Sequence, residues 1–116
     1  MDKKLFEVIV SAVEDKKGKN IVSLDLSGID GAVADAFVIC NADSTAHVAA
    51  IADGVEEKVV NDLKERPRRI EGMNNAVWVV IDYVDVMVHI FQTEARDFYR
   101  LEQLWADAPA TKHGDE

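Results

Sequence analysis

The sequence predicts a single α/β domain in which helices flank a mixed, mostly five-stranded sheet. The chain has 116 residues, close to the commonest size of one domain. Helical and strand-like apolar patterns follow one another along it, and this order is typical of α/β proteins. Strands adjacent in sequence pair antiparallel, whereas a parallel pair needs a helix between its strands, so the predicted order favours a mixed sheet.

The first segment, Lys3 to Lys17, is predicted to be a helix, because apolar residues recur there at helical spacing and Gly18 follows as a natural stop. Ile21 to Leu26 alternates between polar and apolar residues, which predicts a half-buried strand. Ser27 to Ala34 is expected to form a turn. Asp35 to Asn41 is almost continuously apolar and should be a second, central strand.

A long amphipathic helix should follow, capped by Asp43 or Ser44 and ended by Pro67. Apolar residues three and four apart form its buried seam, namely Val48, Ala52, Val55, Val59 and Leu63. Arg68 to Glu71 is predicted to be a short strand. The chain therefore places its longest helix between the central strand and the strands that come after it.

The strongest local pattern is an antiparallel hairpin between Ala76 and Phe91, where two alternating apolar runs flank a turn. If Asp82 lies opposite Asp85, one face is aliphatic and pairs Ile81 with Val86, Val79 with Val88 and Val77 with Ile90. The other face then pairs Trp78 with His89 and Val80 with Met87. Tyr83 and Val84 suit a tight turn poorly, since a β-branched residue resists positive φ, so a looser turn with the same register is expected.

The last helix is predicted from about Glu94 to Trp105, with Thr93 as its cap. Four of its apolar residues are expected to face inward, namely Phe98, Leu101, Leu104 and Trp105. Pro109 to Glu116 is polar and without pattern. The predicted domain therefore covers residues 1–107, and residues 108–116 form a disordered tail.

The charge balance constrains the partner. Thirteen Lys and Arg residues against twenty-two Asp and Glu give a net charge of −9. Such a chain is repelled by phosphate backbones, so direct nucleic-acid binding is disfavoured, whereas binding to a basic protein is favoured. No apolar run approaches the length of a membrane span, and a single cysteine fits the reducing cytoplasm.

Residue types with catalytic chemistry form no known motif. The sequence has no phosphate-binding glycine loop and no nucleophile elbow, and its histidines share no metal-ligand spacing with Cys40. Asp82 and Asp85 could form an acid pair for magnesium or proton transfer, but the favoured interpretation is that they solubilise the hairpin tip. We therefore expect no catalytic residue, no metal and no cofactor.

One face of the predicted hairpin carries a mixed aromatic and acidic patch around Trp78 and His89. An open patch with an aromatic centre and an acidic rim is typical of a protein interface. A helix could equally cover this face and make Trp78 part of the core. The residues leave both options open.

Several ordered motifs resemble those of the ribosomal silencing factors of the Iojap family. They are Ala34 to Cys40, Ser44 to Asp53, Glu71-Gly72, Ala76 to Phe91 and Arg96 to Trp105. The resemblance covers roughly Lys3 to Ala108, and the hairpin is its most specific part. The sequence departs from the family at Ala36, where tyrosine is usual, and at Val84, where glycine is usual.

This resemblance implies a fold similar to a nucleotidyltransferase core, without transferase activity. It also implies that the protein binds a large-subunit ribosomal protein at the face where the small subunit docks, blocks subunit joining and lowers translation when nutrients are short. The resemblance also implies a link to large-subunit maturation, in which members of the family assist in organelles. The partner-binding residues carried over by matching are Trp78, Asp82, Tyr83, Asp85, His89 and Phe91.

Two alternatives remain from the sequence. A nucleotidyltransferase-related enzyme would need paired carboxylates and a Gly-Ser motif, and this chain offers no such Gly-Ser pair. A generic homodimeric interaction domain would pair two copies through the Trp78 face.

Overall fold

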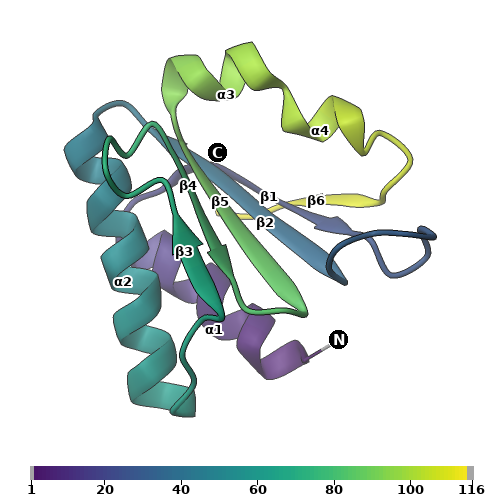
Figure 1. Cartoon of the computed structure of the whole chain (residues 1–116), viewed down its shortest axis with the longest axis horizontal. Helices are drawn as coiled ribbons and strands as arrows, with labels where there is room; N and C mark the ends of the chain where they lie inside the picture. Colours follow the sequence, from purple (N-terminus) through teal and green to yellow (C-terminus); the bar gives the residue numbers. More distant parts are fainter. Residues whose placement is uncertain (1, 115–116) are drawn as a thin grey trace.

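A six-stranded mixed sheet with the strand order β3-β4-β5-β2-β1-β6 forms the centre of the fold (Figure 1). The structure is a computed structural model and describes residues 2–114. The strands are β1 (Lys19–Asp25), β2 (Ala36–Ala42), β3 (Arg69–Glu71), β4 (Trp78–Asp82), β5 (Val86–Gln92) and β6 (Ala110–Lys112). The helices are α1 (Lys3–Asp15), α2 (Thr45–Leu63), α3 (Thr93–Tyr99) and α4 (Leu101–Leu104).

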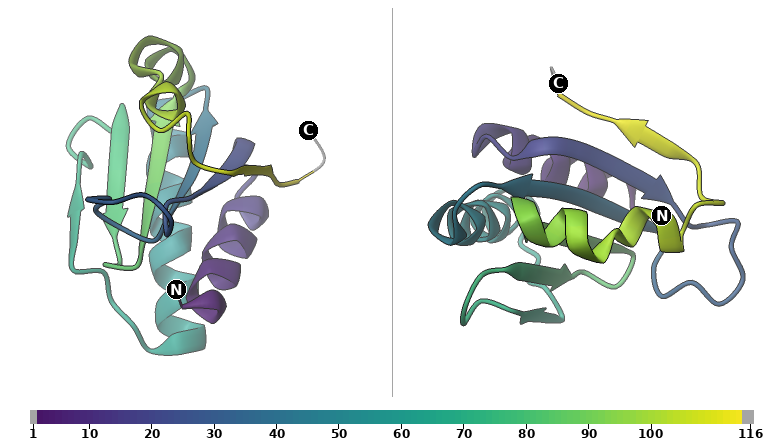
Figure 2. Two further views of the ribbon diagram at one scale, coloured as in Figure 1. Left: turned by 90° about the vertical axis from the view of Figure 1, so that its right-hand side faces the viewer. Right: turned by 90° about the horizontal axis from the view of Figure 1, so that it is seen from above.

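The two faces of the sheet bear different helices. Helices α1 and α2 pack on one face over the larger apolar core, whereas α3 and α4 lie across the other face over a smaller one (Figure 2). Strands β2 and β5 run parallel, and the other neighbours run antiparallel. All seven residues of β2 are buried, which confirms the prediction of a central strand. The mixed α/β fold class is therefore confirmed, while the likeness to a nucleotidyltransferase core stays a prediction.

The two long helices begin at side chains that cap them. The Asp2 carboxylate accepts a hydrogen bond from the backbone N–H of Leu5 at 3.1 Å, and the Ser44 hydroxyl accepts one from the N–H of His47 at 3.1 Å. Helix α2 ends at Lys64, whose φ of 59° is left-handed. No helix within residues 2–114 is long and apolar enough to cross a bilayer.

The predicted hairpin register is wrong by two residues. Asp82 lies opposite Met87 and Trp78 lies opposite Phe91. The turn is wider than the prediction required, because Val84 adopts a φ of 75° and the N–H of Tyr83 bonds the carbonyl of Val86 at 3.0 Å. A shift of two residues leaves the side chains of β4 and β5 on their predicted faces, since side chains alternate with a period of two. Val77 lies before β4 and is the exception, because it packs with Trp78 against the smaller core and not with Ile90. The looser turn is thus confirmed although the register is not.

The predicted disordered tail is also wrong within the described residues. Ala110–Lys112 forms β6, which pairs antiparallel with β1 and makes the sheet six-stranded instead of five-stranded. The Pro109 carbonyl accepts the N–H of Asp25 at 2.9 Å, and Ala108 is buried. The free edge of β1 supplies the partners, and an exposed edge strand needs no apolar pattern. Residues 115–116 lie outside the described range.

The predicted last helix breaks in two. Arg100 adopts a left-handed φ of 50° and separates α3 from α4. Leu101 is buried and Trp105 half-buried, as expected, but Phe98 and Leu104 are 79 % and 76 % exposed. A single straight helix is needed to place all four on one stripe, and the break removes that alignment.

Candidate functional site

The six predicted partner-binding residues do not form one surface. Trp78, His89 and Phe91 lie on the sheet face that α3 and α4 cover. Asp82, Tyr83 and Asp85 lie at the hairpin tip, at the opposite end of β4 from Trp78. At about 3.3 Å per residue, the length of β4 separates the two groups by roughly 13 Å. The structure therefore divides the predicted site in two.

Phe91 belongs to the core. Its exposed fraction is 0 %, and its ring stacks on Trp78 with the ring centres 4.8 Å apart. Trp78 is half-buried, and its other neighbour is Tyr99 of α3, at 4.9 Å between ring centres. Direct contact of Phe91 with a partner is excluded in this conformation, whereas the open part of Trp78 remains accessible.

His89 is a buried, neutral side chain. It is 5 % exposed, and its Nδ1 accepts a hydrogen bond from Trp78 Nε1 at 3.1 Å. The proton of the neutral ring therefore sits on Nε2. The rings of His89 and Phe37 pack edge to face, with 4.5 Å between their centres. Burial lowers the pKa of His89 to about 4. His89 consequently fixes the indole of Trp78 and carries no charge near neutral pH.

Asp82 holds the hairpin tip together. Its Oδ2 accepts two hydrogen bonds from Arg68, at 2.6 Å and 3.1 Å, and its Oδ1 accepts the N–H of Val84 at 2.8 Å. Burial alone would raise the pKa of Asp82, but the Val84 bond and the Arg68 and Arg69 guanidinium groups lower it overall. Both oxygens are thus engaged, which disfavours the acid pair with Asp85. Within residues 2–114, no three His, Cys, Asp or Glu side chains gather as metal ligands do.

Tyr83 points to the opposite side of the sheet from Trp78. It is 8 % exposed and belongs to the core under α1 and α2. Burial first, and then the charges of Glu56 and Glu65, raise the pKa of its hydroxyl. Asp85 is half-buried, and its carbonyl accepts the N–H groups of Asp35 and Ala36 at 2.8 Å and 3.2 Å. These residues secure the turn.

Three exposed apolar side chains lie instead on α3 and α4. They are Phe98, Tyr99 and Leu104, which are 79 %, 48 % and 76 % exposed. The rings of Phe98 and Tyr99 pack edge to face at 5.1 Å, and Tyr99 contacts Trp78. A continuous aromatic stack therefore runs from the buried Phe91 out to Phe98. We call Phe98, Tyr99 and Leu104 the apolar surface.

Sequence reasoning missed this surface because it assigned Phe98 and Leu104 to the core. A signal was present. Residues 98, 101, 104 and 105 already complete one helical stripe, so Tyr99 is an apolar residue in excess of one face. Such an excess on a helix at the end of a domain is typical of a binding surface.

The surroundings of the apolar surface are acidic. Residues 93–108 contain four acidic and two basic side chains. One of the two, Arg96, is buried and paired with Glu102 at 2.7 Å, while Glu94, Asp97 and Asp107 are exposed. An apolar centre with an acidic rim complements a basic protein surface that has an apolar centre of its own.

Comparisons with known proteins agree with one another. The family model described as "Ribosomal silencing factor during starvation" matches residues 2–116. Ribosomal silencing factor RsfS of Halalkalibacterium halodurans is 40 % identical over 111 residues, which cover 96 % of this chain and 93 % of that protein. A crystal structure of a Chromobacterium violaceum protein superposes with a TM-score of 0.85 at 30 % identity, covering 91 % of this chain and 87 % of that one.

A more distant relative comes from an animal. The mouse protein named "Mitochondrial assembly of ribosomal large subunit protein 1" is 28 % identical over 102 residues. The match covers 85 % of this chain but 44 % of the mouse protein.

Proposed function

The chain belongs to the family of ribosomal silencing factors, and from this premise we propose that it binds a basic protein of the large ribosomal subunit through its apolar surface. Bound at the face where the small subunit docks, it sterically blocks subunit joining and represses translation under nutrient limitation. It acts in the cytoplasm by occupying a surface and not by catalysis.

The exposure of Phe98, Tyr99 and Leu104 on a chain of net charge −9 carries this proposal. Burying a large apolar side chain completely contributes about 1.5–3 kcal/mol, so three of them can supply the centre of an interface. The acidic rim repels RNA and speeds encounter with a basic protein. The name of the mouse relative supports the large subunit as the partner.

The predicted site residues take different roles in the proposed complex. Trp78 contacts the partner with its open edge and supports Tyr99 from beneath. His89 and Phe91 act indirectly, because they hold Trp78 from inside the fold. Asp82, Tyr83 and Asp85 shape the hairpin tip, where Asp85 is the most open of the three.

The test is co-sedimentation with purified large subunits at low and high salt. We expect the wild type to co-sediment, and Phe98→Ser combined with Leu104→Ser to weaken binding at least tenfold. Val33→Ser is the matched control, since Val33 is an apolar residue that is 65 % exposed on the loop before β2. Wild-type protein that stays in the supernatant would overturn the proposed partner, and full binding by the double variant would overturn the proposed surface.

The same surface could pair two copies of the free chain. Sedimentation velocity at increasing concentration distinguishes this homodimer from a ribosome-only surface. We propose that pairing through Phe98 and Leu104 competes with ribosome binding. The double variant is then monomeric at concentrations where the wild type associates.

A further inference from the structure

We propose that Arg96 is the positioning residue of the apolar surface, because its buried guanidinium holds α3 and α4 on the sheet. Arg96 holds the two helices in place in the free protein, whatever the protein binds. Only the consequence for ribosome binding rests on the proposed function.

Helices α3 and α4 bury few apolar side chains of their own. They contain seven and four residues, and the residue that precedes α3, Gln92, makes no side-chain capping bond. Helices this short do not persist in isolation. Their buried residues are Ala95, Arg96 and Leu101, so a charged side chain is the largest group that they bury. The position of these helices therefore depends on the contacts of Arg96.

The Arg96 side chain connects three separate elements. Arg96 is 9 % exposed, and its Nη1 donates to the Asn20 carbonyl at 2.6 Å and to Asn41 Oδ1 at 2.8 Å. Its Nη2 donates to Glu102 Oε2 at 2.7 Å. One guanidinium thus joins β1, β2 and α4 while it belongs to α3. A buried cation is tolerated only when it is paired and hydrogen-bonded in this way.

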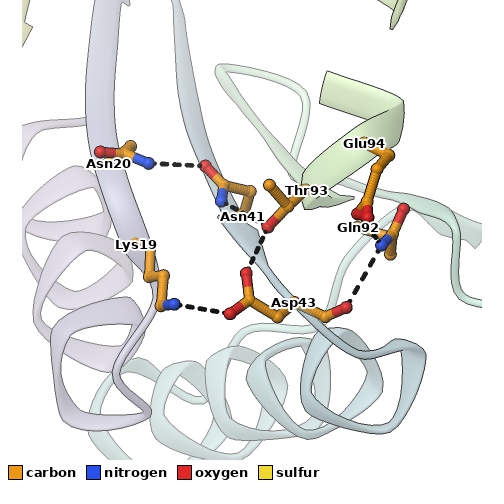
Figure 3. Close-up of polar contacts among 7 residues, drawn as sticks. All are labelled: Lys19, Asn20, Asn41, Asp43, Gln92, Thr93 and Glu94. Carbon is orange, nitrogen blue, oxygen red and sulfur yellow. Dashed lines mark hydrogen bonds and ion pairs between the residues drawn. The ribbon is translucent and has the colours of Figure 1, made fainter. Parts of the chain in front are cut away.

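Further polar contacts fix the start of α3 at the same edge of the sheet (Figure 3). The buried Asn41 donates from Nδ2 to the Thr93 hydroxyl at 2.9 Å, and that hydroxyl donates to Asp43 Oδ1 at 2.7 Å. Asp43 also pairs with Lys19 at 2.7 Å. Strands β2 and β5 run parallel, so their carboxyl ends lie side by side. Asn41 lies near the end of β2 and Thr93 directly follows β5, which brings the two side chains together. A connected network of this kind specifies one arrangement.

The network and the apolar surface share the same short helix. Phe98 and Tyr99 follow Arg96 within one helical turn, and the two rings contact each other. The ring of Tyr99 also packs on Trp78 of β4. Apolar attraction is non-directional, whereas the three hydrogen bonds of Arg96 fix the direction and distance of its acceptors. Losing the guanidinium therefore moves Tyr99 off Trp78.

The chain has two tryptophans, and both lie in this region. Trp78 contacts Tyr99, and Trp105 packs edge to face on Phe37 at 5.7 Å between ring centres. Intrinsic fluorescence consequently reports directly whether α3 and α4 lie on the sheet.

The test compares Arg96→Gln with Arg100→Gln. Arg100 is a matched control, because it is exposed and, among residues 2–114, its guanidinium donates only to the carbonyl of Asp97, at 3.1 Å. In Arg96→Gln we expect amide hydrogen exchange in α3 and α4 to accelerate at least tenfold, with red-shifted emission that acrylamide quenches more readily. Exchange in α2 and β2 should stay as in the wild type, and Arg100→Gln should match the wild type throughout.

Two outcomes would overturn the proposal. Unchanged exchange and emission in Arg96→Gln would mean that apolar packing alone positions the helices. Equal acceleration across the whole domain would make Arg96 a general stability residue. If Arg96→Gln fails to fold, Glu102→Ala decides, since it removes one of the three contacts and should accelerate exchange in α3 and α4 several-fold; no change there contradicts the proposal.

Ribosome binding separates positioning from contact. We expect Arg96→Gln to weaken co-sedimentation at least tenfold together with faster exchange in α3 and α4. Phe98→Ser should weaken co-sedimentation without changing exchange. If the wild type does not co-sediment, the proposed function fails, while the exchange experiment still decides the role of Arg96.

Discussion

Replacing Trp78 with alanine should destabilise the fold and not only remove a contact residue. The indole stacks between Phe91 and Tyr99 at 4.8 Å and 4.9 Å, and it donates a hydrogen bond to the buried His89. A fully buried aromatic residue truncated to alanine costs about 3–5 kcal/mol, and Trp78 is half-buried, so we expect about 2–3 kcal/mol from packing. An unpaired buried acceptor at His89 adds about 1–2 kcal/mol.

Urea unfolding followed by far-UV circular dichroism measures this cost. With the denaturant dependence of small domains, about 1–3 kcal/mol per M of urea, a total loss of about 3–5 kcal/mol lowers the midpoint by at least about 1 M. Trp78→Phe keeps a ring and loses the donor, so it should cost less. Adding His89→Phe to Trp78→Phe should recover part of that cost, because replacing both polar partners with apolar groups removes the unpaired atom. A wild-type midpoint in Trp78→Ala would refute the packing described for the indole.

Three further predictions concern other parts of the molecule. Burial lowers the pKa of His89 from 6.5 to about 4, so the neutral buried ring contributes its full stability above pH 6.5 and this stability is lost as the pH falls toward 4. The urea midpoint of the wild type should therefore fall between pH 6.5 and 4, and the midpoint of His89→Phe should fall less. Truncation after Ala108 removes β6 and the 2.8 Å hydrogen bond between the Ser23 hydroxyl and the His113 ring. The urea midpoint should fall, and co-sedimentation with large subunits should stay unchanged. An unchanged midpoint would mean that β6 adds no stability. A thermal-shift titration with magnesium and ATP should give no saturable gain, whereas a saturating shift with turnover would support the enzyme alternative.

The sequence predicts well where one pattern has one physical meaning. The continuous apolar run of β2 can only be buried on both faces, and the seam of α2 from Val48 to Val59 can only face a core. The faces of β4 and β5 were predicted correctly for the same reason, because alternation depends on parity and not on register, whereas the prediction failed for Val77, which precedes the strand.

Prediction fails where the outcome depends on a single backbone conformation or a distant partner. The left-handed Arg100 divides the last helix and turns Phe98 and Leu104 outward, and no local pattern required that conformation. Strand β6 forms because β1 offers a free edge, a property of the sheet and not of residues 110–112. The role of Arg96 is equally invisible in the sequence, since Asn20 and Asn41 are 76 and 55 residues away.

The most direct test of the proposed interface is hydrogen exchange of the protein bound to purified large ribosomal subunits, compared with the free protein. The account predicts protection concentrated in α3 and α4, around Phe98, Tyr99 and Leu104, with smaller protection at the start of β4. Protection confined to α1 and α2, or to the β6 edge, with α3 and α4 exchanging as in the free protein, would contradict it.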